Sequence, residues 1–171
     1  MTTGAEPKSA DLIALEPTTV LPWELVRDAL ADTRLYWLAT VHPSGRPHVR
    51  PVLAVWLDGA LCSTSTGASR KGRNLAADPR CTVTARTDTM DVVLEGTASQ
   101  VTSEQALLRV AEAYRTKYDW PVTVTGSAFD APYGAPTAGP PPYYPYEITP
   151  ATVFAFGTAD EYGGRTTRYR F

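Results

Sequence analysis

The sequence predicts a mainly β protein of the α+β class, an antiparallel barrel of six or seven strands with about three helices outside it. Short segments that alternate apolar and polar residues recur at the spacing of hairpins. Turn signals separate them, among which Ser44-Gly45 and Asp58-Gly59 stand between apolar runs. Helices are predicted at residues 22–31, 69–78 and 102–118, and such a mixture favours helices packed on the outside of a barrel.

The composition is that of one globular domain. The chain has 171 residues, of which 43% are hydrophobic and 20% are charged. Sixteen lysines and arginines against 18 acidic residues give a net charge of −2, so we expect no nucleic-acid partner. The sequence has no apolar run long enough for a membrane span and no leader pattern in its first twenty residues. We therefore expect a cytoplasmic protein without a membrane span.

Cysteine and histidine are too sparse to predict a metal site. Cys62 and Cys81 lie on separate predicted strands without CxxC spacing, and we interpret them as reduced, buried residues; a disulfide is the alternative. The two histidines, His42 and His48, have no clustered partners.

We divide the chain into a mobile N-terminal arm, residues 1–16, and one barrel domain, residues 17–171. The arm has few large apolar residues and no periodicity. The helix at 22–31 begins with Pro22, and the first strand is expected to follow at 35–41. The remaining strands are expected at residues 47–57, 61–66, 81–85, 91–101 and 152–156. The basic, aromatic tail at 165–171 is expected to complete the sheet or to reach a neighbouring subunit's cofactor.

The strand from Pro47 to Leu57 divides into two faces with the two-residue period of a strand. One face is interpreted as core and comprises Val49, Leu53, Val55 and Leu57. The other is interpreted as the side that contacts a ligand or a partner subunit and comprises His48, Arg50, Val52, Ala54 and Trp56.

An anion site is predicted where the next strand ends and a short helix begins. The strand ends in three hydroxyl residues, Thr64, Ser65 and Thr66. Ser69 is the expected N-cap of a helix that Asp78-Pro79 closes. Free backbone N–H groups, the helix dipole and the charges of Arg70 and Lys71 would together favour a phosphate. The alternative is that Arg70, Lys71 and Arg73 form a solvated helix face.

Residues 126–150 differ in composition from the rest of the chain. They hold seven of the fifteen prolines and four of the nine tyrosines. We interpret this loop as an ordered wall or lid on the substrate side, because irregular stretches of this length are often functional. The substrate-side candidates are His48, Trp56, Tyr133 and Tyr143. The alternative is a surface segment that covers the barrel or stabilises a dimer.

These motifs resemble the pyridoxamine 5′-phosphate oxidase-like superfamily, the split β-barrels that bind flavins and deazaflavins. In the oxidases a strand reading Arg-x-Val-Leu-Leu-Lys leads to a Ser-Arg-Lys loop that holds the flavin phosphate. Here the strand reads Arg50-Pro51-Val52-Leu53-Ala54-Val55, and the loop Ser69-Arg70-Lys71 is complete. Val55 replaces the lysine of the motif, which argues against oxidation of a vitamin phosphate but leaves the phosphate site intact. The segments 45–52 and 70–75 are similar to the actinobacterial branch, in which many members use the deazaflavin coenzyme F420 instead of FMN.

The resemblance implies a split barrel that forms a homodimer, with two cofactor sites at the interface. The cofactor-binding residues it implies are Arg50, Pro51, Val52, Thr64, Ser65, Thr66, Ser69, Arg70, Lys71 and Asn74. The function it implies is an F420-dependent reductase that transfers hydride to an electron-poor double bond of a small organic substrate. One alternative is an FMN-dependent oxidase or flavin reductase, and another is a non-catalytic carrier of a flavin, a deazaflavin or a haem. No catalytic residue is assigned, because the sequence contains no evident pair of nucleophile and base.

Overall fold

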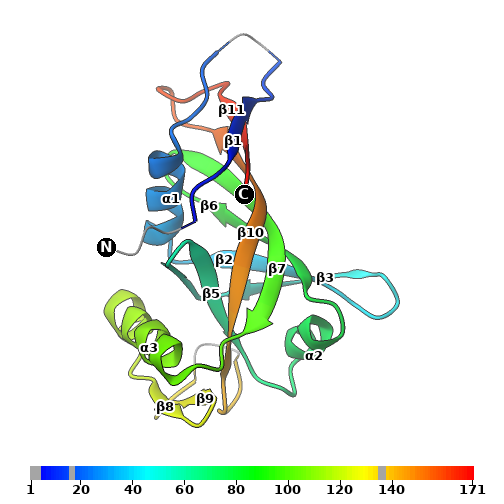
Figure 1. Cartoon of the computed structure of the whole chain (residues 1–171), viewed down its shortest axis with the longest axis vertical. Coiled ribbons are helices and arrows are strands. Elements are labelled where there is room, and N and C mark those ends of the chain that lie inside the picture. The colour runs from blue at the N-terminus through cyan, green and yellow to red at the C-terminus, as the bar shows by residue number, and fades with distance from the viewer. Residues whose placement is uncertain (1–4, 16–17, 135–137) are drawn as a thin grey trace.

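The computed structural model describes residues 5–15, 18–134 and 138–171, and these contain three helices and eleven strands (Figure 1). Their order is β1 (Ser9–Leu12), α1 (Trp23–Asp32), β2 (Tyr36–Val41), β3 (Pro47–Val52), β4 (Ala54–Leu57), β5 (Ala60–Ser65), α2 (Arg70–Ala77), β6 (Arg80–Arg86), β7 (Met90–Gln100), α3 (Glu104–Tyr118), β8 (Thr123–Thr125), β9 (Ala128–Asp130), β10 (Tyr144–Gly157) and β11 (Thr166–Arg170). Within this part of the chain, no helix has both the length and the apolar character needed to cross a membrane.

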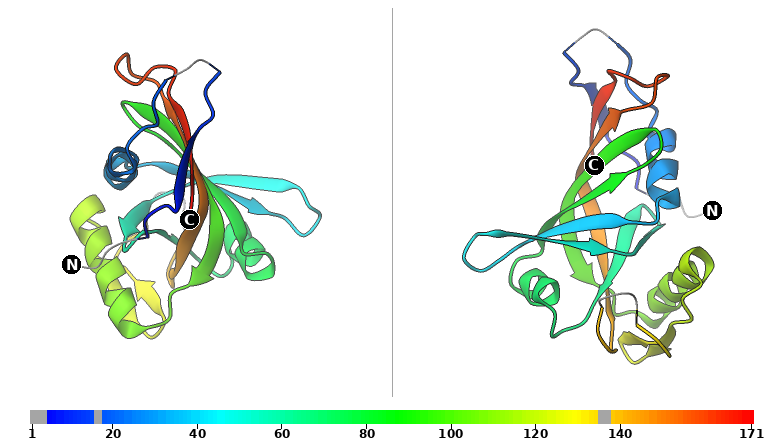
Figure 2. Two further views of the ribbon diagram at one scale, coloured as in Figure 1. Left: turned by 45° about the horizontal axis from the view of Figure 1, so that its top comes forward. Right: turned by 180° about the vertical axis from the view of Figure 1, so that it is seen from behind.

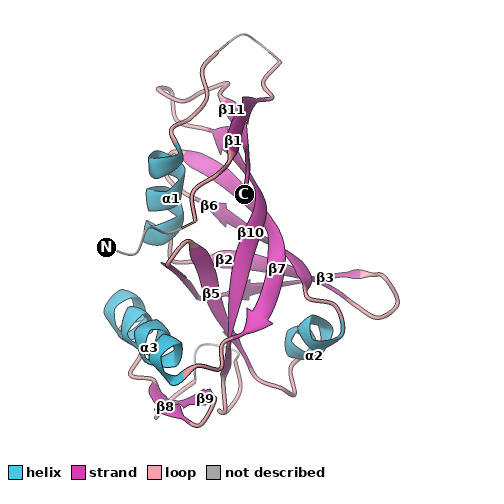
Figure 3. Cartoon of the chain, viewed as in Figure 1, coloured by secondary structure: helices cyan, strands magenta, loops and turns pink. Residues whose placement is uncertain are grey.

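Nine strands form one antiparallel sheet that curves into a split barrel. The long strand β10 pairs with β7 on one edge, and on its other edge it pairs first with β5 and then with β11. The order continues from β7 through β6 and β2 to β3. Because β3 runs directly into β4, which pairs with β5, the chain closes the barrel. Helices α1 and α3 lie on one side of the barrel and α2 lies on the other (Figure 3). The predicted fold class is confirmed.

The segment from 47 to 57 forms two strands instead of one. β3 pairs with β2 whereas β4 pairs with β5, so the chain bends and changes partner between them. The predicted faces are therefore wrong for part of the segment: Val52 and Ala54 are buried in the main core, and Val49 is 44% exposed. The core position predicted for Val55 is correct. Both faces of β4 are covered, because Val55 packs into a second core together with residues of α3.

The N-terminal segment supplies the ninth strand of the sheet. β1 pairs antiparallel with β11, and the Asp11 carboxylate forms ion pairs with Arg168 (3.2 Å) and Arg170. Residues 9–12 of the expected mobile arm thus belong to the sheet, because β11 offers them a free edge of backbone partners. Residues 1–4 and 16 of that arm lie outside the described residues.

Two hydrophobic cores support the barrel. The main core lies under α1, where Trp23 packs against Tyr169 and Phe171 with ring centroids 5.2 and 5.1 Å apart. The second core lies between α3 and the β8–β9 hairpin and includes Trp120 and Tyr143, whose ring centroids are 5.2 Å apart. The N-cap of helix α3 is Ser103, so the helix starts at Glu104, two residues after the start predicted at residue 102.

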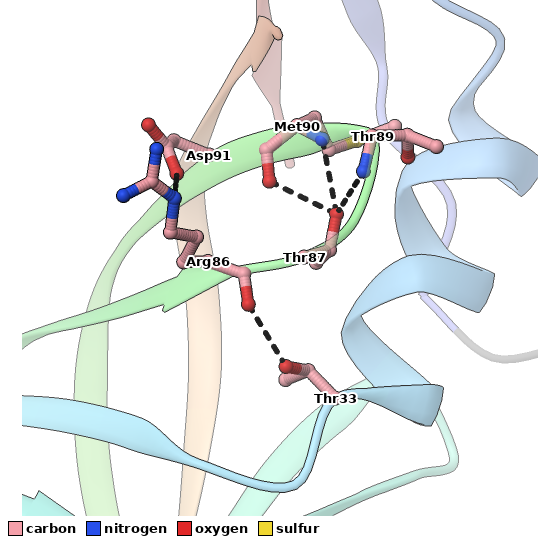
Figure 4. A network of polar contacts seen from close by, with 6 residues as sticks. All are labelled: Thr33, Arg86, Thr87, Thr89, Met90 and Asp91. Carbon is pink, nitrogen blue, oxygen red and sulfur yellow. Dashed lines mark hydrogen bonds and ion pairs between the residues drawn. The ribbon is translucent and has the colours of Figure 1, made fainter. Parts of the chain in front are cut away.

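A hydroxyl group closes the turn between β6 and β7. The Thr87 hydroxyl donates to the Met90 carbonyl (2.9 Å) and accepts the N–H groups of Thr89 and Met90 (Figure 4). The Thr33 hydroxyl donates to the carbonyl of Arg86 (3.2 Å), which attaches the end of α1 to this turn.

The Pro/Tyr-rich segment is more regular than predicted. Of residues 126–150, β9 and the first half of β10 belong to strands, and Tyr143 exchanges both backbone hydrogen bonds with Phe129. The irregular part is thereby reduced to residues 131–143, of which 135–137 lie outside the described residues.

Candidate functional site

A cleft of about 630 Å³ opens between β3, the end of β5 and the start of α2. Its lining residues are Leu35, His48, Arg50, Pro51, Val52, Leu53, Thr64, Ser69, Arg70, Lys71 and Ala138. The apolar lining residues at the end of β3 and next to it, which we call the apolar wall, are Leu35, Pro51, Val52 and Leu53. They share the cleft with His48 and Arg50 of β3 and with hydroxyl and cationic side chains from β5 and α2. No carboxylate occurs in this described lining, so the cleft suits a ligand with both a flat apolar part and an anionic part.

Ser69 positions the start of α2. Its hydroxyl accepts the N–H of Gly72 (3.1 Å) and donates to the carbonyl of Thr66 (2.9 Å). The Ser65 hydroxyl lies 2.7 Å from that of Ser69 and supports the same cap. The cap leaves the N–H groups of the first two helical residues, Arg70 and Lys71, without an intrahelical acceptor. An anion at this position would therefore meet free donors and the positive end of the helix dipole.

Gly72 allows α2 to lie close against the end of β5. A Cβ atom at this position would lie 2.6 Å from the Thr66 carbonyl oxygen and 2.9 Å from the Ser65 hydroxyl oxygen, which is closer than Cβ atoms approach in proteins. The absence of a side chain therefore keeps the first turn of the helix next to the strand that carries Thr64.

In the part of the chain that the structure describes, the positive charge of the cleft has no acidic partner. Among the described residues, Arg50, Arg70 and Lys71 form no ion pair, whereas eight other ion pairs occur in the same part of the chain. Lys71 is half-buried, and burial lowers its pKa. The Arg50 guanidinium donates to the carbonyl of Val49 (2.7 Å). Such uncompensated cations fit a phosphate or another anion better than a structural role.

His48 lines the cleft from β3, and cations surround it. Its Nδ1 lies 3.5 Å from the Thr40 hydroxyl, which also accepts the side-chain amide of Asn74 (3.0 Å). Burial and the charges of Arg50 and Arg70 lower the pKa of His48, which favours the neutral imidazole.

The structure brings eight of the predicted site residues together in the cleft. They are His48, Arg50, Pro51, Val52, Thr64, Ser69, Arg70 and Lys71. Ser65, Thr66 and Asn74 lie behind it: the first two support the helix cap, and Asn74 is fully buried against Thr40.

The other substrate-side candidates lie elsewhere. Trp56 packs against Trp23 with ring centroids 6.1 Å apart, in the main core. Tyr143 is buried in the second core, and Tyr133 is exposed and donates to the carbonyl of Asp119 (3.0 Å). The Pro/Tyr-rich segment contributes Ala138 to the cleft lining instead.

Sequence reasoning missed three residues of the cleft, Leu35, Leu53 and Ala138. Leu53 was assigned to the core face of one continuous strand, but it lies at the break between β3 and β4. Leu35 was placed in the first predicted strand, but it precedes β2. Ala138 carries no local signal at all, because only the path of a long loop brings it to the cleft.

Comparison with known proteins agrees with this architecture. A sequence model described as pyridoxamine 5′-phosphate oxidase matches residues 22–155. No match was found among curated proteins. Among solved structures, a conserved hypothetical protein from Mycobacterium tuberculosis is 25% identical, with 81% of this chain and 86% of that chain covered and a TM-score of 0.62.

Two further structures show the same fold at lower identity. A heme binding protein from Mycobacterium smegmatis is 21% identical, with 89% of this chain and 60% of that chain covered and a TM-score of 0.67. A pyridoxamine 5′-phosphate oxidase-related, FMN binding protein from Nostoc punctiforme is 19% identical, with 88% and 91% covered and a TM-score of 0.57. Since the sequence match spans most of the chain and includes both the barrel and the cleft, this protein belongs to the pyridoxamine 5′-phosphate oxidase family of split β-barrels.

Proposed function

We propose that this protein is a reductase that holds coenzyme F420 in the cleft and transfers hydride to an electron-poor double bond of a small organic substrate. The observation that carries the proposal is the group of unpaired cations at the capped start of α2, beside an apolar wall. Membership of the pyridoxamine 5′-phosphate oxidase family, which is named after a flavin-dependent oxidase, supports a redox cofactor as the ligand.

The residues of the cleft fit a cofactor that joins a phosphate to a flat ring system. Arg70, Lys71 and the Thr64 hydroxyl would hold the phosphate, and Ser69 would act through the helix cap. Arg50 and the backbone at Pro51 and Val52 would lie along the ring. The bound cofactor would supply the hydride, while the protein would orient it, exclude water and hold the substrate.

FMN is the second candidate cofactor, and it would make the protein an oxidase or a flavin reductase. Its support is the FMN binding relative with the same fold. A carrier without catalysis is the candidate from another class. The heme binding relative supports it, as does the cleft lining, which contains no pair of acid and base among its described residues.

We further propose that the protein is a homodimer with the cofactor sites at the interface. The β2–β3 hairpin extends away from the body of the molecule (Figure 2). It and the residue before it expose three large apolar side chains, Leu35 (51%), Trp37 (47%) and Val49 (44%). Leu35 also lines the cleft, so a partner that covers this surface would border the ligand. Light scattering after size exclusion should give twice the mass of the chain, and Trp37→Glu should shift it to one chain.

The proposal is tested by titrating ligand-free protein with F420 and with FMN while the absorbance spectrum is recorded. We expect binding of F420, and oxidation of the reduced coenzyme by members of a panel of enones and quinones. Turnover with FMN and no affinity for F420 would reverse the choice of cofactor. Tight binding of either cofactor without turnover across the panel would favour the carrier.

A further inference from the structure

Helix α3 binds the backbone at the bend between β3 and β4 through three side chains on one of its faces. Tyr114, Lys117 and Tyr118 are three and four residues apart, which places them together on a helix. The bend lies where the chain changes from the β2 pairing to the β5 pairing. Backbone groups at such a break lose regular ladder partners and need others.

The two tyrosines bond to consecutive residues of the bend. The Tyr118 hydroxyl accepts the N–H of Ala54 (3.1 Å) and donates to the carbonyl of the same residue (2.8 Å). The Tyr114 hydroxyl donates to the Leu53 carbonyl (3.0 Å), which also accepts from the Ser63 hydroxyl (3.0 Å). Both peptide groups next to the bend are thus held from the α3 side.

Lys117 adds a charged contact to the same point. Its ammonium donates to the carbonyls of Ala54 (3.1 Å) and Ala31 (2.7 Å) and to the hydroxyl of Tyr36 (2.9 Å). Three protons therefore meet three acceptors, and one of these lies in the last turn of α1, where the helix dipole favours a cation. We call Tyr114, Lys117 and Tyr118 the α3 clamp.

The clamp lies behind the apolar wall of the cleft. Leu53, whose carbonyl the clamp binds, and its neighbour Val52 both line the cleft, whereas no clamp residue does. The phosphate side of the cleft is built from the end of β5 and the cap of α2. Of the clamp residues, Tyr114 also bonds to β5, at the Cys62 carbonyl (3.2 Å), whereas the hydrogen bonds of Tyr118 and Lys117 go to other parts of the chain. A change at Tyr118 or Lys117 should therefore move the wall without moving Arg70 and Lys71 of α2.

We propose that Tyr118 and Lys117 are positioning residues that set the ring-binding wall of the cleft through Ala54, without touching the ligand. This inference rests on the proposed function, in which the ring of the cofactor lies against the residues of β3. It predicts that the clamp affects the affinity for a cofactor with a ring but not the affinity for inorganic phosphate.

The test compares Tyr118→Phe with Tyr169→Phe in the full-length protein. Each substitution removes one hydroxyl that bonds to the backbone. The Tyr118 hydroxyl bonds to the N–H and the carbonyl of Ala54 and also lies 3.1 Å from the Arg34 carbonyl, whereas the Tyr169 hydroxyl bonds to Leu21, far along the chain from the bend. In ligand-free protein, we expect faster hydrogen exchange at the Ala54 amide in Tyr118→Phe only. We further expect binding of F420 or FMN about fivefold to tenfold weaker in Tyr118→Phe, because the cofactor would then have to order a loosened wall, with the affinity for inorganic phosphate unchanged.

The possible failures are separable. Unchanged exchange at Ala54, or equal weakening of cofactor and phosphate binding, would overturn the positioning role and make Tyr118 a structural residue. Absence of cofactor binding by the unmodified protein would instead contradict the proposed function. Hydrogen exchange at Ala54 is measured without ligand. It therefore shows whether Tyr118 holds the wall even if the unmodified protein binds no cofactor.

Discussion

Lys71 and Arg73 lie two residues apart on α2, but their environments differ. Lys71 is half-buried and lines the cleft, and burial lowers its pKa. Arg73 is exposed and lies outside the cleft lining. The interpretation as a solvated helix face therefore suits Arg73. The Lys71 ammonium loses part of its hydration, and a bound anion would compensate for this loss.

Lys71→Ala should weaken cofactor binding about tenfold to a hundredfold, because charge-assisted hydrogen bonds contribute roughly 1.5–3 kcal/mol. The thermal midpoint of the ligand-free protein should hardly change, since Lys71 has no ion pair among the described residues. Ligand titration and thermal unfolding measure the two quantities, with Arg73→Ala as the matched control. A lower midpoint with unaltered affinity would instead make Lys71 structural.

At the scale of the element, the start of α2 depends on how closely the helix approaches β5. The Ser69 cap and Gly72 act at the same place. The Ser69 hydroxyl bonds to the Thr66 carbonyl and the Ser65 hydroxyl, and a side chain at Gly72 would collide with the same two oxygens. The start of α2 is therefore held against the end of β5, and Arg70 and Lys71 line the same cleft as Thr64.

Gly72→Ala should destabilise the protein by about 1–3 kcal/mol, because the added methyl group would overlap a backbone carbonyl in a close-packed site. Urea denaturation measures the free energy of unfolding. Gly67→Ala is the matched control: a Cβ there would meet only a ring atom of Tyr144 at the ordinary distance of 3.7 Å. Equal effects of the two substitutions would show that the close approach has no energetic weight.

The α3 clamp gives the stability a dependence on pH. Burial lowers the pKa of Lys117 to about 8; nearby Asp32 opposes this shift and Arg34 adds to it. In the unfolded chain the pKa is about 10.4, so between these values the unfolded state binds more protons. The free energy of unfolding should therefore rise as the pH increases above about 8.

Lys117→Met removes the titrating group and should abolish this rise relative to the unmodified protein. Urea denaturation at several pH values from about 7 to about 9.5 measures the difference, and it avoids the range near 10 in which exposed tyrosines ionise. Lys71 titrates in both proteins and cancels from the comparison. Parallel profiles for the two proteins would show that Lys117 keeps its ordinary pKa in the fold.

At the scale of the whole molecule, the C-terminal strand joins parts of the chain that are far apart in sequence. β11 lies between β1 and β10, and its Tyr169 is fully buried against Trp23 of α1. The Tyr169 hydroxyl also donates to the carbonyl of Leu21. The main core is therefore completed only when the last residues of the chain are in place.

Tyr169→Ala should destabilise the protein by about 3–5 kcal/mol, the usual cost of removing a large aromatic side chain from a core. Phe156→Ala in the neighbouring strand is the control, because Phe156 is exposed and its removal leaves no cavity in the core. Denaturant unfolding followed by tryptophan fluorescence measures both. A small effect at Tyr169 would mean that the core rearranges to fill the space.

The sequence by itself determined the fold class and the start of α2. Hairpin turns, strand alternation and the N-cap of a helix are local signals, which act between residues close together in the chain. For this reason the sequence alone predicts Ser69, Arg70 and Lys71 as one site, and the resemblance to the family includes the same residues.

Only the tertiary structure decided which residues of the bend and of the loops line the cleft. The face of Val49 and the burial of Val52 depend on the pairing of β3 with β2 and of β4 with β5. Asn74 and Tyr143 were placed in the interior by packing partners more than ten residues away. Where a chain segment bends and pairs with a different strand, the side chains after the bend no longer continue the alternation of those before it. The sequence of that segment alone does not show this change, because the pairing depends on other strands.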